Sequence, residues 1–378
     1  MTPVATREKS PPAQALYIAF ELGERKWKIA CTTGAGQAPR IRQLDARDLA
    51  RLDEEILLAK IRLNVASEAP VYTCYEAGRE GFWLHRTLVV RGLVNTVVDS
   101  SSIEVNRRAR RAKSDKLDVV KLVTMLIRYQ GGEKRVWHVV RVPTAAEEDQ
   151  RQLHRELAVL KRDRTAVIIR VKSLLATQGV AGGPRAVLPE AIDALRIWNG
   201  ERLPQRLAER LKLECARVAS LDTQIRLLER RRKHELRHGR GRALSLVRKL
   251  MKLRGIGIES AWIYVMELFA WRELKNVRQV GALAGLTPSP YQSGDMNHER
   301  GISKAGNRHV RGIAIEIAWG WLQHQPQSEL SRWYHHQFGA GRSAMRRKGI
   351  VALARKLLIA LWKYTEHDQL PAGAALKG

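Results

Sequence analysis

Apolar residues follow two different spacings in the first third of the chain. Short continuous apolar runs are typical of strands, and apolar residues three or four positions apart are typical of helices. The expected order is three strands (16–22, 26–32 and 40–44), a helix (46–66), a strand (70–76), a helix (80–92), a strand (94–100) and a helix (114–129). This alternation predicts an α/β domain over residues 16–130.

The middle of the chain changes to long charged segments with apolar residues at helical spacing. Residues 144–179 and 204–238 predict two long helices, and a Gly/Pro-rich stretch at 178–189 separates them. Spaced Leu, Ile and Val among dense charge favours an antiparallel helical arm or coiled coil over residues 144–238.

The last part of the chain predicts a helical domain over residues 243–366, so the expected fold class is α/β plus all-α. This domain opens with a helix, the pair Gly255 and Gly257, and a second helix, an order similar to a helix-hairpin-helix. Such hairpins present backbone N–H groups to a phosphate, and an ordinary helix–helix turn is the alternative. Residues 1–15 are expected to be a disordered tail, and residues 367–378 a second tail.

The charge of the chain predicts its partner. The 378 residues include 67 Lys and Arg against 38 Asp and Glu, which gives a net charge of +29. So large an excess predicts a polyanion, and nucleic acid is the usual one. An anionic membrane surface is the alternative, but the sequence has no run of about 18 apolar residues to span a bilayer. The three cysteines show neither a disulfide framework nor zinc spacing, which predicts a reduced, cytoplasmic protein.

A dense basic run between residues 105 and 118 ends on two acids. The cations expected to contact nucleic acid are Arg107, Arg108, Arg110, Arg111 and Lys113. Asp115 and Asp118 are three residues apart, so they share one face of a helix that begins near Ser114. They suit a metal site, or a first helical turn in which the dipole favours acids and Ser114 is the cap.

Two further acids lie at the ends of predicted strands. Glu21 is near the end of the first strand, and Glu76 ends the strand over residues 70–76. Unpaired buried charge is costly, and ligands of open α/β sheets gather at the carboxyl ends of strands. Cleavage of a phosphodiester by metal ions needs several converging carboxylates. The set Glu21, Glu76, Asp115 and Asp118 therefore predicts a Mg²⁺ site beside the basic run.

A second basic stretch lies near the C-terminus. Residues 301–311 predict a Gly-rich turn that leads into a basic helix, and a solvated helix start is the alternative. The side chains suited to phosphate contacts are Lys304, Asn307, Arg308 and Arg311. Residues 342–364 predict a basic amphipathic helix with Arg346, Arg347 and Lys348 outside.

Four motifs follow one another along the chain. They are an acid on the first strand, "YEAG", "KSDKLD" at the start of a helix, and "GALAGLTPSPYQSGD…GISKAGNRHVR". Together they resemble the DEDD transposases of the insertion sequence 110 family, whose relatives include Piv-type DNA invertases. The resemblance covers about residues 16–366. It implies a RuvC-like (RNase H-type) N-terminal domain, a coiled-coil arm and a C-terminal transposase domain.

The resemblance also implies an activity, which is that of a DNA transposase or site-specific recombinase of a bacterial insertion sequence. Mg²⁺, or Mn²⁺, would bind the acidic cluster, and a serine would form a covalent serine–DNA intermediate. A structured guide (bridge) RNA would pair with donor and target double-stranded DNA. The protein would act in the cytoplasm at the nucleoid. We expect a homodimer or tetramer, because recombination of two duplexes needs four strand cuts.

The family's site residues transfer to this chain with departures. Glu76, Asp115 and Asp118 match the second, third and fourth acids. Glu21 stands where the family usually has Asp, one methylene shorter, and Glu24 stands where Lys is usual. An altered metal preference or weakened activity would follow.

Ser293 in "YQSGD" best fits the serine nucleophile, because Gly294 lets the backbone approach a phosphate closely. Serine is a poor nucleophile unless a base or a metal activates it. The alternatives are a simple turn at Ser293, a loop role for Ser289, and Tyr291 as a tyrosine nucleophile. The competing functions are a Holliday-junction-type metal-dependent nuclease that uses water, and a catalytically decayed nucleic-acid-binding relative.

Overall fold

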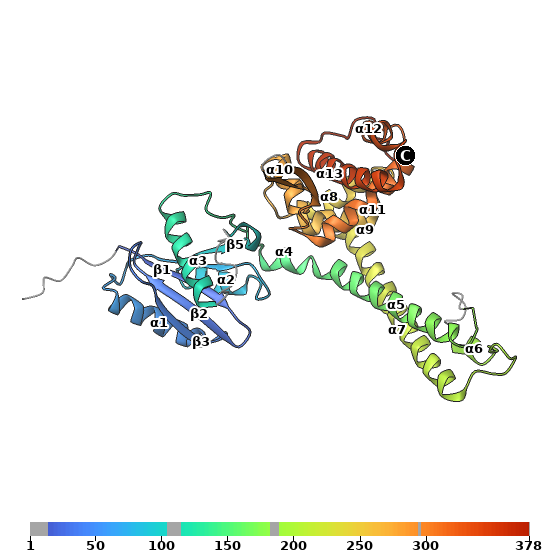
Figure 1. Ribbon diagram of the computed structural model, residues 1–378, viewed down its shortest axis with the longest axis horizontal. Helices are drawn as coiled ribbons and strands as arrows, with labels where there is room; N and C mark the ends of the chain where they lie inside the picture. Colours follow the sequence, from blue (N-terminus) through green and yellow to red (C-terminus); the bar gives the residue numbers. More distant parts are fainter. Residues whose placement is uncertain (1–13, 104–114, 182–188, 294–295, 378) are drawn as a thin grey trace, which may run out of the picture. The chain divides into compact units, whose positions relative to one another are not determined.

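The structure is a computed structural model that describes residues 14–103, 115–181, 189–293 and 296–377 (Figure 1). For residues 101, 115–116, 189, 289–293 and 296–300 the backbone alone is described. The chain divides into two compact units, with the boundary between Pro143 and Thr144. Each unit has its own apolar core.

The first unit is built on a mixed sheet. Its described residues form five strands in the order β3-β2-β1-β4-β5. The first three strands are antiparallel neighbours, and β4 and β5 are added parallel to β1. The strands are β1 (Leu16–Leu22), β2 (Lys26–Thr32), β3 (Arg40–Asp45), β4 (Val71–Glu76) and β5 (Val94–Val98). The α/β part of the predicted fold is confirmed.

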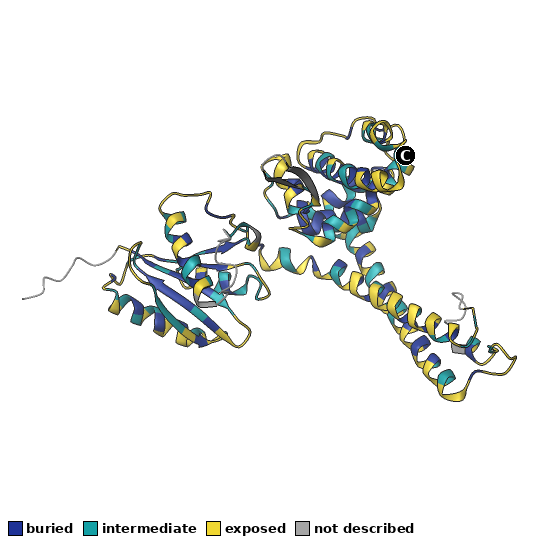
Figure 2. Ribbon diagram, viewed as in Figure 1, coloured by how far each residue is buried: buried dark blue, intermediate teal, exposed yellow. Residues whose placement is uncertain are grey.

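Helices cover both faces of this sheet. On one face, α1 (Leu49–Arg62) and α2 (Trp83–Val90) pack on Phe20 and Trp27. On the other face, α3 (Asp115–Gln130) packs on small side chains that let the helix approach closely. Because both faces are covered, the central strands are continuous apolar runs, as the burial in Figure 2 shows. A short 3₁₀ turn, η1 (Ser100–Ser102), follows β5.

Two long helices form an arm in the second unit. They are α5 (Gln152–Ala176) and α7 (Gln205–His238). Arg170 pairs with Glu214 at 2.7 Å and Lys161 with Glu229 at 3.1 Å, so residue numbers rise along one helix as they fall along the other. The helices are therefore antiparallel. Apolar residues are buried between the two helices. Figure 2 shows mostly exposed residues on the outer faces of the helices. The short helices α4 (Ala145–Asp149) and α6 (Pro189–Ile192) flank α5.

The rest of the second unit is helical around one core. Leu353, Leu357 and Leu361 of the last helix are fully buried in this core. The elements are α8 (Arg242–Met251), α9 (Ile258–Tyr264), the π-helical turn η4 (Val265–Phe269), α10 (Val277–Leu283), β6 (Pro288–Ser293), β7 (Met296–Ile302), α11 (Arg308–His324), α12 (Glu329–Phe338) and α13 (Ser343–His367). The prediction of a helical C-terminal region is confirmed, with the β6–β7 hairpin as an addition.

The segment that follows α13 returns to the loop between α8 and α9. Leu376 forms a β-bridge with Leu253, and the Lys377 Nζ donates to the Ile256 carbonyl oxygen at 2.8 Å. The Arg254 N–H donates to the Ala375 carbonyl oxygen at 3.1 Å. The described part of the expected C-terminal tail is therefore held on the core. No helix among the described residues is long and apolar enough to cross a membrane.

Candidate active site

Two acidic residues lie side by side at one edge of the sheet in the first unit. The parallel strands β1 and β4 pair Phe20 with Tyr75, so Glu21 and Glu76 are the next residues of each strand. Side chains alternate along strands, and Ala19, two residues before Glu21, packs in the cluster that α3 covers. Cys74, two residues before Glu76, packs in the same cluster. Both carboxylates are therefore on the α3 face, at the carboxyl ends of neighbouring strands.

Helix α3 places Asp118 over the same face. The Cys74 thiol is 3.7 Å from the Leu122 carbonyl oxygen, and Asp118 lies one helical turn before Leu122. Asp118 is half-buried. Asp115 is the first residue of α3, but its side chain is outside the described residues. Three of the four predicted acids therefore lie on the side of the sheet that α3 covers, namely Glu21, Glu76 and Asp118.

The chemistry of this acidic set suits a hard cation, because carboxylate oxygens are the ligands that Mg²⁺ prefers. Among the described side chains, no group of three or more His, Cys, Asp or Glu residues is arranged to hold a metal ion. Asp115 is not among those side chains. The metal site therefore stays a prediction.

Basic residues lie close to Glu21 in sequence and register. Lys28 of β2 is the direct cross-strand partner of Glu21, so an ammonium group shares its face of the sheet. Glu24, in the turn between β1 and β2, forms an exposed ion pair of 3.2 Å with Arg79. A cation is thus present beside this turn even though the residue itself is acidic. The basic run over residues 104–114, with Arg107, Arg108, Arg110, Arg111 and Lys113, lies outside the described residues.

Ser293 lies at the tip of the β6–β7 hairpin. It is the last residue of β6 and pairs with Met296 of β7. The serine side chain is outside the described residues. Since strand residues alternate, Tyr291 and Ser293 belong to the same face of the hairpin.

A cationic cavity lies at the base of the same hairpin. Its volume is about 760 Å³. The hairpin contributes Pro288, Gly301 and Ile302, and α13 contributes the opposite wall. Four cations line it, namely Lys304, Lys348, Arg355 and Lys356. A cavity with an apolar floor and a cationic lining suits a phosphate backbone that runs past the hairpin.

The four phosphate ligands predicted near the start of α11 fall into two groups. Two of them make contacts within the protein, and the other two are exposed. Asn307 caps α11, because its Oδ1 accepts from the His309 N–H at 2.9 Å. The Arg311 guanidinium donates to the Lys304 carbonyl oxygen at 2.9 Å. These two residues hold the loop in shape. Lys304 and Arg308 are exposed and form no ion pair within the described part of the chain.

The Gly255–Gly257 loop is occupied by contacts within the protein. Gly255 has a positive φ of 82°, and a Cβ there would lie 3.1 Å from the His324 Cβ. The Gly257 N–H donates to the Ser260 Oγ at 3.1 Å, which uses the group expected to meet a phosphate. The phosphate contact predicted for this loop stays a prediction.

One buried carboxylate was absent from the sequence-based prediction. Glu267 of η4 is fully buried and accepts hydrogen bonds from His154 at 2.8 Å and from the Arg155 Nε at 2.7 Å. Burial alone raises the pKa of Glu267, but the hydrogen bonds from His154 and Arg155 outweigh it and hold the pKa well below its usual range. The only signal in the sequence is an acid inside the apolar run "VMELF".

Comparison of the sequence with known proteins identifies a family. The family model described as "Transposase IS116/IS110/IS902 family" matches residues 247–332, which include the β6–β7 hairpin, Glu267 and Asn307. The putative transposase y4rJ of Sinorhizobium fredii is 38% identical over 376 residues, which is 96% of this chain and 95% of that protein. The transposase for insertion sequence element IS1328 of Yersinia enterocolitica is 24% identical over 234 residues, or 60% of this chain and 66% of that protein.

These relationships define a transposase. The extent and identity of the Sinorhizobium match cover both units of the fold. The chain belongs to the IS116/IS110/IS902 transposase family.

Proposed function

We propose that this protein is the DNA transposase of a bacterial insertion sequence and that it cuts and rejoins DNA through Ser293. The observation that carries the proposal is the adjacent placement of Glu21 and Glu76 at the carboxyl ends of β1 and β4, on the face covered by α3. The strand order supports an RNase H-type (RuvC-like) unit, in which an antiparallel three-stranded meander is extended by two parallel strands.

The proposed chemistry is an exchange of phosphodiester bonds. The Ser293 Oγ forms a bond to the phosphorus of the scissile phosphate. The bond from that phosphorus to one sugar oxygen breaks, and this oxygen takes the proton that the serine gives up. Attack by a different sugar hydroxyl on the serine-linked phosphorus then joins the new strands and returns the serine to its hydroxyl form.

Glu21, Glu76, Asp115 and Asp118 would hold Mg²⁺, or Mn²⁺. A bound divalent cation stabilises the attacking and leaving oxygens of a phosphoryl transfer. The cations that line the cavity at the base of the hairpin would hold the DNA backbone. They are Lys304, Lys348, Arg355 and Lys356. Lys28, across the strand pair from Glu21, would offset part of the negative charge of the acidic set.

The proposed partners are donor and target double-stranded DNA and a structured guide RNA that pairs with both. The net charge of +29 supports a large polyanionic partner. The proposed assembly is a homodimer or tetramer. Exposed apolar side chains along the arm support association, among them Leu213 and Leu227 of α7 and Ile169 of α5. The antiparallel helices would then form a coiled coil with those of another copy.

The test is to trap the serine–DNA intermediate. The purified protein is mixed with RNA transcribed from the flanks of its element, labelled donor DNA and Mg²⁺. Denaturing electrophoresis then separates free DNA from protein-linked DNA. We expect a denaturation-resistant adduct that disappears in Ser293→Ala and in Asp115→Ala. Omitting the RNA tests the guide, and we expect the adduct to be lost.

Two matched variants serve as controls. Ser289→Ala changes another serine of β6, and Glu68→Ala removes an exposed acid near the opposite end of β4. Both should keep the adduct. DNA nicks without an adduct, unaffected by Ser293→Ala, would replace the proposal with a nuclease that uses water. Tight DNA binding without nicks or adduct would indicate a decayed relative.

A further inference from the structure

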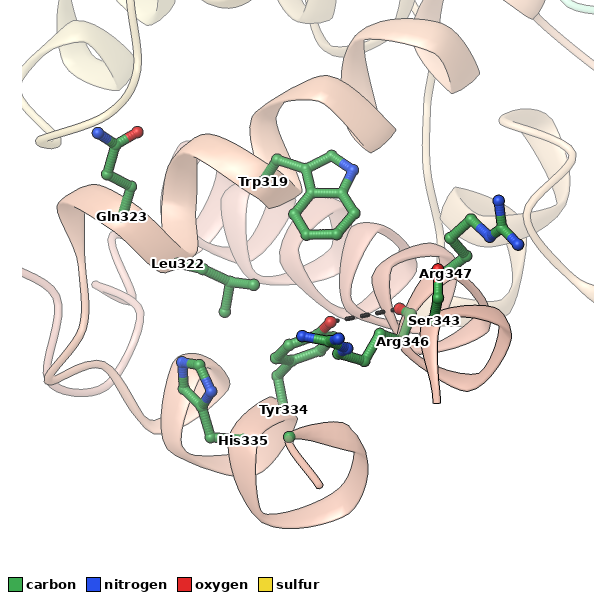
Figure 3. A pocket seen from close by; sticks show the side chains of 9 residues that line it. Trp319, Leu322, Gln323, Tyr334, His335, Ser343, Arg346 and Arg347 are labelled. Carbon is green, nitrogen blue, oxygen red and sulfur yellow. Dashed lines mark hydrogen bonds between the residues drawn. The ribbon is translucent and has the colours of Figure 1, made fainter. Parts of the chain in front are cut away.

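A second cavity lies between α11, α12 and the start of α13 (Figure 3). It shares no lining residue with the cavity at the base of the β6–β7 hairpin. Its volume is about 430 Å³. Sites for small ligands have volumes of about 300–1,000 Å³, so the cavity has room for one nucleotide. The lining residues that matter are Trp319, Leu322, Tyr334, His335, Arg346 and Arg347.

Trp319 gives this cavity a flat aromatic wall. Its side chain is 49% exposed, whereas Trp321, two residues along α11, is fully buried. Figure 3 shows the indole ring facing the space above Tyr334 and Leu322. A large aromatic ring that is half exposed gives up much of the stabilisation that burial would supply. Indole rings placed in this way are the platforms on which unstacked nucleobases lie.

Two arginines of α13 line the cavity opposite Leu322. In Figure 3 the Arg346 guanidinium lies beside Tyr334, and the Arg347 guanidinium points away from Tyr334. Arg346 and Arg347 lie in the first turns of α13, and both are exposed. Within the described residues neither forms an ion pair, and no acidic side chain lines the cavity. Guanidinium groups are the side chains best suited to bind phosphate in a bidentate manner. The Tyr334 hydroxyl donates to the Arg346 carbonyl oxygen at 3.3 Å, which ties the arginine-bearing turn of α13 to α12 (Figure 3).

We propose that this cavity binds one unstacked nucleotide of a single-stranded nucleic acid. The base stacks on Trp319, and the flanking phosphates pair with Arg346 and Arg347. A duplex does not enter, because its bases are already stacked and paired. The inference rests on the proposed function only in taking nucleic acid as the partner, and it does not involve Ser293 or the acidic set.

The first experiment measures binding of labelled oligonucleotides by fluorescence anisotropy, without added metal. One sequence is used as single-stranded DNA, as single-stranded RNA and as duplex DNA. Stacking contributes about 1–3 kcal/mol per base, so Trp319→Leu should weaken single-strand binding about 5- to 150-fold. Trp319→Phe should recover most of this loss, and duplex binding should not change. Trp198→Leu, at a tryptophan that is 79% exposed on another part of the unit, is the matched control.

The second experiment tests the phosphate contacts through salt dependence. In the Arg346→Gln/Arg347→Gln double variant, the slope of log affinity against log salt for a single strand should fall by about 0.7 per lost phosphate contact. That is a fall of about 1.4 for two contacts. Circular dichroism and thermal unfolding of each variant check that the fold is retained.

Each outcome of these binding experiments either supports or overturns the nucleotide site. A loss with both single strands, or with only DNA or only RNA, supports the site, and the selective losses identify which strand occupies it. Unchanged single-strand binding in Trp319→Leu overturns the proposal, as does an equal loss for duplex and single strand. If Trp319→Leu changes the molecular mass of the protein in solution and leaves single-strand binding unchanged, the cavity belongs to a protein interface instead. A chain that forms no serine–DNA adduct but loses single-strand binding on Trp319→Leu would retain this site and refute the recombinase proposal.

Discussion

Asn307 connects Glu267 to the first turn of α11 through a single side-chain amide. Its Nδ2 donates to the Glu267 Oε2 at 2.7 Å, and its Oδ1 accepts from the Val310 N–H at 3.2 Å. Glu267 also accepts from His154 and Arg155 of α5. One buried carboxylate therefore ties the arm helix to the loop that presents Lys304 and Arg308.

Removing this carboxylate should destabilise the second unit. Glu267→Ala leaves His154 buried and Arg155 without its partner, and a broken buried ion pair costs about 3–5 kcal/mol. Urea unfolding followed by circular dichroism measures the loss. Glu316→Ala, an exposed acid on α11, should change the free energy of unfolding by less than about 0.5 kcal/mol. Equal stabilities for the two variants would contradict a structural role for Glu267.

The same group should make stability depend on acid pH. The pKa of Glu267 is lowered in the folded protein, so its contribution is fully present above the unfolded value of about 4.3. The contribution is then lost as the pH falls from about 4.3 toward the lower folded pKa. The difference in unfolding free energy between the parent and Glu267→Gln should be larger at about pH 5 than at about pH 3, because it shrinks below about pH 4. A difference that grows on acidification would have the wrong sign.

The loop before α11 should not tolerate a side chain at Gly306. Its φ is +110°, and an added Cβ would overlap the Leu283 carbonyl group. Gly306→Ala should cost about 1–3 kcal/mol and weaken nucleic-acid binding, because Lys304 is displaced. Gly312→Ala is the matched control, since its Cβ would point into open space on α11. That variant should be about 0.5–1 kcal/mol more stable than the parent. Thermal unfolding and anisotropy test the pair.

Glu21 should be required for metal-dependent cleavage despite its extra methylene. We expect Glu21→Gln to abolish adduct formation with Mg²⁺, since an amide is a weaker ligand than a carboxylate. Glu21→Asp should keep activity with a different Mg²⁺ concentration at half-maximal rate. Glu24→Gln, at the exposed acid paired with Arg79, should behave like the parent. Full activity in Glu21→Gln would exclude this residue from the metal set.

The arm should control assembly. Leu213 and Leu227 are 63% and 57% exposed, and their spacing along α7 places them on one face of the helix. The Leu213→Gln/Leu227→Gln double variant should have a lower mass in light scattering than the parent at the same concentration. The control Arg226→Gln, on the same helix, should have the same mass as the parent. A parent protein that is monomeric at every concentration would contradict the prediction.

The strands were predictable from the sequence for a physical reason. A sheet covered on both faces needs apolar residues at every position, so residues 16–22 and 71–76 stand out as continuous runs. The acids Glu21 and Glu76 stand out for the same reason, because each interrupts such a run. The register that makes them neighbours is a property of strand pairing and was available only from the fold.

Other features depend on contacts that no local pattern encodes. His154 and Glu267 are 113 residues apart in the sequence, so neither residue signals its partner. The β6–β7 hairpin was missed because two prolines in "PSPYQS" are typical of a loop. Trp319 and Trp321 both fit a helical pattern, and only the packing of α12 and α13 decides which of them is exposed.

The return of the chain to the α8–α9 loop has a consequence for the order of events during synthesis. Lys377 and Ile256 are 121 residues apart, yet one closes a hydrogen bond on the other. The loop therefore leaves the ribosome long before its partner exists. Contacts of such long range form late, so the nascent helices α8 and α9 are exposed to chaperones and proteases until this C-terminal segment has been synthesised.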